Sequence, residues 1–248
     1  MEWREADGVR WLEAELPGAR AAFSTRLGGL STGPFESLNL GVLTDDDRDR
    51  VIGNRRRLCA ALGLEPGRVA IGLQVHRAGI EERSAAQDPS PFAEPGSPNP
   101  EADGQVLRDP SLAGLVFVAD CLPMALSGPG GRAILHCGWR GLAAGIVEKG
   151  VVATGATAAA VGPGIGPCCY EVGAEVLDAF APLGDGVAEG RMLDLPEVAR
   201  RLLEAAGVHE VETAGLCTAC EEDIFFSHRR DRGRTGRQGG VVFAGSGG

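Results

Sequence analysis

Residues 115–141 read LVFVADCLPMALSGPGGRAILHCGWRG, and this stretch indicates the fold class. It holds two short apolar runs, 115–119 and 132–136, with glycine and proline between them, which is typical of strands. A glycine-rich turn follows the second run, and a helical pattern extends over 142–152. Strands that alternate with helices predict an α+β or mixed α/β fold.

The same alternation continues on both sides of this stretch. Apolar runs bounded by glycine or proline predict further strands over 21–25, 69–76, 157–161 and 240–243. Helical patterns bordered by glycine or acidic residues predict helices over 46–62, 173–180 and 196–206. The chain has no repeat of fixed period. We therefore expect a single compact domain over 1–248, with mixed sheets and helices packed on them.

Two segments lie outside this pattern. Five prolines, with serine, asparagine and glycine among them, occupy residues 85–100 and predict a surface loop or lid, which would divide two subdomains if the chain had them. The closing GSGG of residues 245–248 predicts a flexible tail.

The composition excludes several classes of protein. A formal net charge of -10 argues against a nucleic-acid partner, which needs a basic face to displace counterions from phosphates. The apolar runs are far shorter than the ~20 residues of a membrane helix, and the N-terminus lacks the apolar centre of a secretory signal. Seven cysteines cannot all pair as disulfides. We expect a cytoplasmic protein without a membrane partner.

Three side chains that can bind a metal occupy equivalent positions in the pattern. His76 and His136 each close an apolar run, and Cys121 follows the run 115–119 and Asp120. Functional residues of α/β proteins gather at strand ends, on loops held by a rigid scaffold. One thiolate and two imidazoles suit Zn²⁺ and leave a fourth tetrahedral position open, as in catalytic sites.

Spacing alone leaves several alternatives open for these three residues. The separations match no zinc-finger pattern, so spacing alone favours a buried free cysteine beside two hydrogen-bonded histidines over a metal site. A metal-free cysteine hydrolase would use Cys121 as nucleophile and His136 or His76 as base. A copper site would add Met124 as an axial ligand, although four histidines are too few for a multi-copper oxidase. A zinc-stabilised binding module is the alternative that is not an enzyme.

Seven short motifs resolve part of this ambiguity. They occur in one order along residues 23–240 and read FSTRLGG (23–29), SLNLG (37–41), QVH (74–76), ADC (119–121), HCGWRG (136–141), GPGIGPCCYEVG (162–173) and FFSHRRD (225–231). Together they resemble the YfiH/laccase-domain family. The resemblance implies the YfiH fold, which is similar to that of cysteine hydrolases.

The resemblance also implies a function and a ligand set. Members of this family are described as zinc-containing purine nucleoside enzymes that phosphorolyse adenosine, inosine and methylthioadenosine and also deaminate adenosine; an older label is polyphenol oxidase. The family's metal ligands correspond to His76, Cys121 and His136, so zinc is expected, with copper as the alternative. The partners would be a nucleoside and phosphate, and the protein a monomer or homodimer. Arg77, Cys137 and His228 depart from the usual motif residues but remove no ligand.

Three further residues are predicted to act beside the metal. Asp120 would orient a ligating imidazole or shuttle a proton, where the plain alternative is a solvated strand end. Arg26 would hold phosphate through a bidentate guanidinium, where the alternative is a turn arginine. Asn39 would hydrogen-bond ribose or base, although asparagine before glycine is also a common turn former. With Cys121, Asp120 and Arg26 form the predicted catalytic set.

Other predicted substrate contacts come from arginine-containing motifs. Arg140 follows His136 closely and is expected to reach the site, while His228 and Arg229 begin an arginine-rich run that either binds phosphate or forms a solvated face. The remaining polar motif is Cys217-x-x-Cys220, which lacks the second pair of a structural zinc site, and Cys168–Cys169 resemble packing or loop thiols. We assign neither cysteine pair to a metal.

Overall fold

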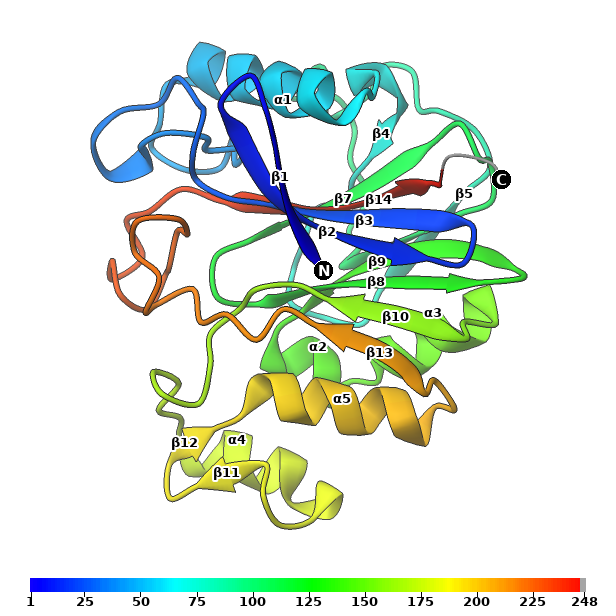
Figure 1. Ribbon diagram of the computed structural model, residues 1–248, viewed down its shortest axis with the longest axis vertical. Coiled ribbons are helices and arrows are strands. Elements are labelled where there is room, and N and C mark those ends of the chain that lie inside the picture. Colours follow the sequence, from blue (N-terminus) through cyan, green and yellow to red (C-terminus); the bar gives the residue numbers. More distant parts are fainter. Residues whose placement is uncertain (246–248) are drawn as a thin grey trace.

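Two six-stranded sheets pack face to face, with helices on both outer faces, in the computed structural model, which describes residues 1–245 (Figure 1). The first sheet has the order β1-β2-β3-β14-β7-β4, and only its β4–β7 pair is parallel. Its strands are β1 (Glu2–Ala6), β2 (Val9–Leu16), β3 (Ala19–Ser24), β14 (Gln238–Ala244), β7 (Ala113–Val118) and β4 (Val69–Ala70).

The second sheet has the order β13-β10-β8-β9-β6-β5, with parallel pairs at both edges and antiparallel pairs in the middle. Its strands are β13 (Glu210–Thr213), β10 (Ala158–Val161), β8 (Leu122–Gly128), β9 (Gly131–Cys137), β6 (Gly104–Leu107) and β5 (Ile80–Arg83). A separate ribbon pairs β11 (Ala188–Glu189) with β12 (Met192–Leu193). Both large sheets are mixed, which confirms the predicted fold class.

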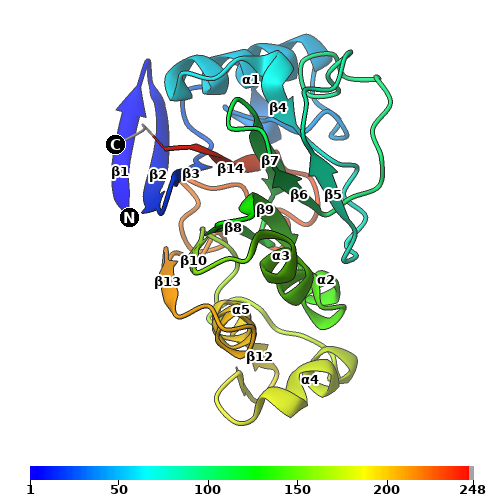
Figure 2. The ribbon, with the colours of Figure 1, turned by 90° about the vertical axis from the view of Figure 1, so that its right-hand side faces the viewer.

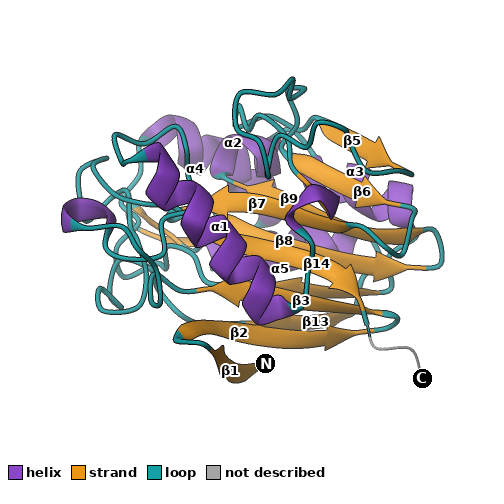
Figure 3. Ribbon diagram, turned by 90° about the horizontal axis from the view of Figure 1, so that it is seen from above, coloured by secondary structure: helices purple, strands orange, loops and turns teal. Residues whose placement is uncertain are grey.

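Helices cover the two outer faces unequally. Helix α1 (Arg48–Leu62) lies alone over the first sheet, and α2 (Trp139–Ala143), α3 (Ile146–Thr154), α4 (Ala174–Phe180) and α5 (Leu195–Ala205) lie on the side of the second sheet (Figures 1 and 2). The view from above shows α1 crossing the strands beneath it (Figure 3). Short 3-10 turns span Gly33–Phe35, Pro66–Arg68 and Ala181–Leu183.

This layering creates three hydrophobic cores. Leu58 of α1 packs with Leu115 of β7 above the first sheet. Ile134 lies between the two sheets, and its neighbour Leu135 packs on the other side with Val147 of α3. Successive side chains of a strand point to opposite faces, so strand β9 contributes to two cores at once. One compact domain of mixed sheets and covering helices results.

Two predicted elements differ from the structure. The strand expected over 69–76 ends at Ala70, because the Gln74 side chain takes over pairing with β7: it donates to Phe117 O and accepts from Phe117 N, both at 2.8 Å. The helix expected over 142–152 is divided at Gly145, whose φ of 80° is left-handed. Strand β1 was not predicted, because its mostly exposed charged residues form no apolar run.

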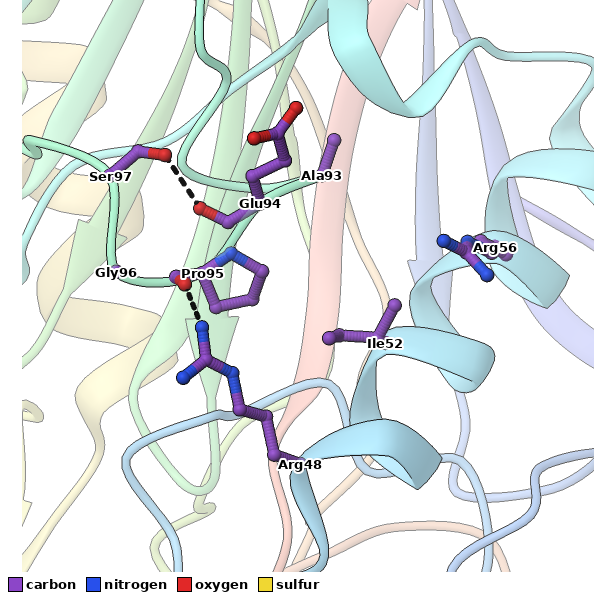
Figure 4. A pocket seen from close by; sticks show the side chains of 8 residues that line it. All are labelled: Arg48, Ile52, Arg56, Ala93, Glu94, Pro95, Gly96 and Ser97. Carbon is purple, nitrogen blue, oxygen red and sulfur yellow. Dashed lines mark hydrogen bonds between the residues drawn. The ribbon is translucent and has the colours of Figure 1, made fainter.

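The proline-rich segment 85–100 contains no helix or strand, as predicted, but it does not divide subdomains. Phe92 is completely buried in the core above the first sheet. Arg55 of α1 donates to Phe92 O at 2.8 Å, and Arg48 donates to Pro95 O. A shallow depression remains between α1 and this loop, lined by Arg48, Ile52, Arg56, Ala93, Glu94, Pro95, Gly96 and Ser97 (Figure 4).

Two further predictions concern the C-terminal tail and membrane-spanning helices. The predicted tail begins at Gly245, and residues 246–248 lie outside the described part. Across residues 1–245, none of the helices has both the length and the apolar character needed to cross a membrane.

We expect truncation to destabilise the protein at one of two adjacent valines of α3 and not at the other. Val151 is 8% exposed and Val152 is 78% exposed. Val151→Ala should lower the free energy of unfolding by about 2 kcal/mol, because it removes two buried methyl groups and leaves a small cavity. Val152→Ala, the matched control, should stay within about 0.5 kcal/mol of the parent. Urea denaturation measures both, and equal losses would contradict the packing of α3 on the second sheet.

Candidate functional site

The structure brings His76, Cys121 and His136 together. Their potential ligand atoms all lie within 4.8 Å of one another, and the two imidazole rings meet edge-on with centroids 4.8 Å apart. Cys121 lies between β7 and β8, and His136 is the penultimate residue of β9. His136 is buried, Cys121 is half-buried and His76 is exposed, so the cluster opens toward solvent on one side.

A carboxylate that we did not predict fixes two of these residues. Asp103 is completely buried, and its Oδ1 lies 2.8 Å from His136 Nδ1. The same carboxylate accepts hydrogen bonds from the backbone N–H groups of Val75, His76 and Arg77, at 3.2, 2.9 and 2.8 Å. Because Nδ1 is engaged, His136 directs Nε2 toward Cys121. Asp103 therefore performs the orienting role that we expected of Asp120.

Backbone conformation contributes to the site as well. His76 has a φ of 58°, a left-handed value that is uncommon for a residue other than glycine. The Asp103 hydrogen bonds to this segment hold it there. A Cβ on Gly138 would lie 2.9 Å from Cys121 Sγ and 3.5 Å from His76 Cδ2. Glycine at position 138 is thus what lets the chain pass so close to the cluster.

The three side chains influence each other's protonation. Burial opposes ionisation of the Cys121 thiol, but the charge and hydrogen bonds of His136 and His76 outweigh it and lower the pKa of Cys121 to about 6. Burial would also lower the pKa of His136, yet the Cys121 thiolate and Asp103 raise it to about 9. One soft thiolate and two imidazoles form a donor set that fits zinc.

Asp120 acts on loops instead of on the imidazoles. Its Oδ1 accepts from Thr218 Oγ1 and its Oδ2 accepts from Arg229 N, both at 2.7 Å. Its backbone oxygen accepts from Ile165 N at 2.8 Å, and its φ of 90° is left-handed. Three chain segments are tied to the residue that precedes Cys121. Such strained positions recur at functional sites because the surroundings over-determine them.

Cationic and phenolic side chains lie beside the cluster. The Arg229 guanidinium stacks on Tyr170, 5.2 Å from the ring centroid, and Nη1 donates to Glu171 O at 2.9 Å. Burial first, and then the charge of Cys121, raise the pKa of Tyr170 to about 12, against the effects of Arg229 and Arg140. Tyr170 therefore keeps its hydroxyl proton. Arg140 is exposed and stacks on Trp139.

Asn39 requires a correction. It is completely buried, and its Nδ2 donates to Thr44 Oγ1 and Asp46 Oδ2, both at 2.9 Å. Its Oδ1 accepts from Gly41 N at 3.0 Å and Arg237 N at 2.8 Å. The amide has no donor or acceptor left for ribose or base. Asn39 is a loop anchor.

Arg26 also makes contacts other than those expected. Nε donates to Glu36 O at 2.6 Å and Nη1 donates to Glu222 O at 3.0 Å, while the guanidinium stacks on Phe226. Two of the five N–H donors of the guanidinium are therefore committed to backbone carbonyls. Fewer donors than expected remain for phosphate.

The remaining predicted residues divide by exposure. His228 is exposed and its ring lies against Gly233, so it stays accessible to a ligand. Cys137 is completely buried, and burial raises the pKa of its thiol, which separates its reactivity from that of Cys121. Met124 is completely buried in the core under the second sheet, which does not favour an axial copper contact.

A second group of potential ligands was missed. Cys168, Cys169, Cys217 and Cys220 have their sulfur atoms within 4.8 Å of one another. The pair that the Cys217-x-x-Cys220 motif appeared to lack is the Cys168–Cys169 dipeptide. The two pairs are distant in sequence, and only the fold unites them.

Known proteins resemble this chain along almost its whole length. A family model described as multi-copper polyphenol oxidoreductase laccase matches residues 20–245. The purine nucleoside phosphorylase YlmD of Geobacillus stearothermophilus is 37% identical over 258 residues, which cover 94% of this chain and 93% of that protein. The purine nucleoside phosphorylase YfiH of Escherichia coli K12 is 35% identical over 240 residues, or 91% and 94% of the two chains.

The fold agrees with these sequence relationships. The crystal structure of YlmD from Geobacillus stearothermophilus superposes with a TM-score of 0.89 and 35% identity, covering 98% of each chain. The structure of a YfiH protein from Bacillus licheniformis superposes with a TM-score of 0.86 and 31% identity. By its family match, its relatives and its fold, this chain belongs to the YfiH/laccase-domain family.

Proposed function

We propose that this protein is a zinc-dependent purine nucleoside phosphorylase that acts on adenosine, inosine and methylthioadenosine and also deaminates adenosine. The observation that carries the proposal is the convergence of His76, Cys121 and His136 at a solvent-facing site with Arg140 and Arg229 nearby. The name purine nucleoside phosphorylase, which relatives such as YlmD and YfiH carry, supports the same reaction class.

The proposed zinc ligands are His76, Cys121 and His136. A zinc ion held by them would supply Lewis-acid catalysis and activate water. Within residues 1–245, this cluster contains no fourth histidine, cysteine or carboxylate. That open coordination position favours an enzyme over a zinc-stabilised binding module, in which protein would complete the tetrahedron.

In phosphorolysis, a phosphate oxygen forms a bond to C1′ of the ribose while the bond from C1′ to the purine nitrogen breaks. The purine leaves with the bonding electron pair and needs a proton. We assign phosphate binding to Arg140 and Arg229, whose positive charges also oppose repulsion by the Cys121 thiolate. The protonated hydroxyl of Tyr170 is a hydrogen-bond donor for the departing base.

Deamination would use the same purine position without phosphate. Water adds to C6 of adenosine and ammonia leaves, which gives inosine. The two activities thus differ in their need for the arginines. Asp120 would act here as a positioning residue that holds Cys121 and the Arg229 backbone in register.

One specific observation favours a second candidate, a metal-free cysteine hydrolase. Asp103, His136 and Cys121 form a hydrogen-bonded series, the arrangement of an orienting acid, a base and a nucleophile. Exhaustive chelation distinguishes the candidates. Activity that survives chelation but is lost on treatment with iodoacetamide would favour the hydrolase.

The copper alternative makes a different prediction about loaded protein. Of the four histidines, His209 and His228 are absent from the metal-competent clusters of the described residues. An oxidase that reduces oxygen to water needs further copper ligands. Copper-loaded protein should therefore oxidise a phenol no faster than the metal-free protein.

We expect Cys121→Ser and His136→Ala to abolish most turnover of adenosine and inosine. Removing the hydrogen-bond partner of a metal ligand can lower activity by ~100-fold, and removing the ligand itself should lower kcat/KM by at least as much. His209→Ala, an exposed histidine outside the site, is the control and should retain parent activity. Chromatography of products with and without phosphate separates ribose 1-phosphate from inosine. Absence of both products with the zinc-loaded parent would refute the proposal.

We expect Asp103→Asn to weaken zinc binding while the protein stays folded. An amide NH₂ would face N–H donors in either orientation, so the His136 tautomer and the His76 backbone lose support. Zinc affinity should fall about 10- to 100-fold in competition with a chromogenic chelator. Asp178→Asn, at an exposed position of α4, should leave affinity unchanged. Parent-like affinity in folded Asp103→Asn would contradict the orienting role.

We expect Arg140→Gln to separate the two activities. Removing the charge should raise the KM for phosphate about tenfold or more, since charge-assisted hydrogen bonds are strong. The phosphate-independent deamination of adenosine should change less than about twofold, because phosphate takes no part in it. Arg56→Gln, an exposed arginine of α1 in the depression of Figure 4, serves as the control. A parallel loss of both activities would place Arg140 elsewhere in the reaction.

A further inference from the structure

Four cysteines outside the proposed active site meet at the ends of two loops. Cys220 Sγ lies 3.4 Å from both Cys168 Sγ and Cys169 Sγ. Cys217 completes the group, and all four sulfur atoms lie within 4.8 Å of one another. The two cysteine pairs are far apart in the sequence, which gives no sign that they meet. The fold brings them together.

The sheet explains why the two loops meet. Strands β10 and β13 are parallel neighbours, so the chains that leave Val161 and Thr213 emerge at the same edge. A further bridge joins Gly164 to Cys217, and Thr218 N donates to Gly164 O at 3.0 Å. The backbone therefore holds the loops together before any contact between sulfur atoms is considered.

The distances suit one metal ion better than one disulfide. In a tetrahedral site with Zn–S bonds of about 2.3 Å, the sulfur atoms lie about 3.8 Å apart. The observed spread, with two contacts at 3.4 Å and all pairs within 4.8 Å, brackets that value. A disulfide would join only two of the four sulfur atoms.

The surroundings also resemble those of a thiolate ligand. Gly166 N donates to Cys217 Sγ at 3.3 Å. Such donors stabilise negative charge on sulfur. A Cβ on Gly166 would lie 3.3 Å from Cys217 Cβ and 3.5 Å from Cys168 Sγ, so glycine leaves room for the cluster.

We propose that Cys168, Cys169, Cys217 and Cys220 bind one Zn²⁺ ion as a structural tetrathiolate site. Four protein ligands close the coordination sphere, so this ion would have no open position for substrate. The ion would cross-link the loop after β10 to the loop after β13. Binding of this ion would not require the proposed nucleoside chemistry.

The proposed zinc site would influence the active site through one buried residue. Thr218 lies between the ligating cysteines, is completely buried, and donates to Asp120 Oδ1 at 2.7 Å. Arg230 Nη1 donates to Thr218 O at 2.8 Å. Loss of the metal would therefore loosen the support of Asp120, next to Cys121. The four cysteines would be positioning residues for the active site.

Metal content of the full-length protein tests the proposal. Protein purified under reducing conditions and saturated with Zn²⁺ should hold about two ions per chain, one at each cluster. The double variant Cys168→Ser/Cys220→Ser should lose one ion and keep the other, and Cys121→Ser should show the complementary loss. Cys59→Ala, a buried cysteine of α1 remote in sequence from both clusters, is the matched control and should change nothing.

A spectroscopic measurement identifies the ligands. In the Cys121→Ser background, Co²⁺ should produce the intense sulfur-to-cobalt charge-transfer and visible bands of a tetrahedral tetrathiolate site. Adding Cys168→Ser/Cys220→Ser should remove them. The proposal is overturned if Cys121→Ser binds no Zn²⁺ under reducing conditions, or if intact mass shows a disulfide among these cysteines that persists under the same conditions. If the Cys168→Ser/Cys220→Ser variant loses one ion but the zinc-loaded parent turns over no purine nucleoside, the tetrathiolate site is supported and the proposed function is refuted.

Discussion

The site depends most on a single buried carboxylate, that of Asp103. It accepts three consecutive backbone N–H groups on one side of the cluster and contacts His136 Nδ1 on the other. A buried charge in an apolar interior would be costly if it were unpaired. Here the donors compensate it, and in return they fix one ligand through its backbone and another through its ring.

Asp120 makes the corresponding connection on the other side of Cys121. Its carboxylate joins the loop that carries Thr218 to the segment that begins at Arg229. Asp120 and His76 both have left-handed φ values, and both are next to or within the ligand set. Strain of this kind persists only where several contacts enforce it. Two of the four non-glycine residues with left-handed φ values in residues 1–245 therefore lie at positions that aspartate hydrogen bonds tie down.

Local signals made part of this structure predictable. Helix α1 begins after Asp47, whose side chain accepts from Arg50 N at 2.9 Å, and it ends at Gly63 in the left-handed conformation. Both residues are recognisable helix boundaries in the sequence. The apolar runs that stop next to Cys121 and at His136 likewise marked these residues as close to strand ends. Cys121 lies between β7 and β8, and His136 is the penultimate residue of β9.

Interactions between distant residues were not predictable in this way. Asp103 lies 27 residues from His76 and 33 from His136, and no local pattern distinguishes it from any other aspartate before a strand. Cys168 and Cys220 are 52 residues apart. The sequence around Asn39 is compatible with both a substrate contact and a turn. The four hydrogen bonds of its side chain, which the sequence does not reveal, show that it anchors a loop.

The two clusters together suggest how rigidity and exposure are divided in this fold. Backbone donors and the buried Asp103 and Asp120 hold the ligands of the first cluster, so a side chain on the solvent side can be left without a structural role. Arg140, which is exposed and whose side chain stacks on Trp139, shows this separation. A site built this way can change its cationic rim without disturbing its ligands. Changes at Asp103 or Thr218, by contrast, should reach the ligands through the backbone, because both residues are completely buried and committed to the loops.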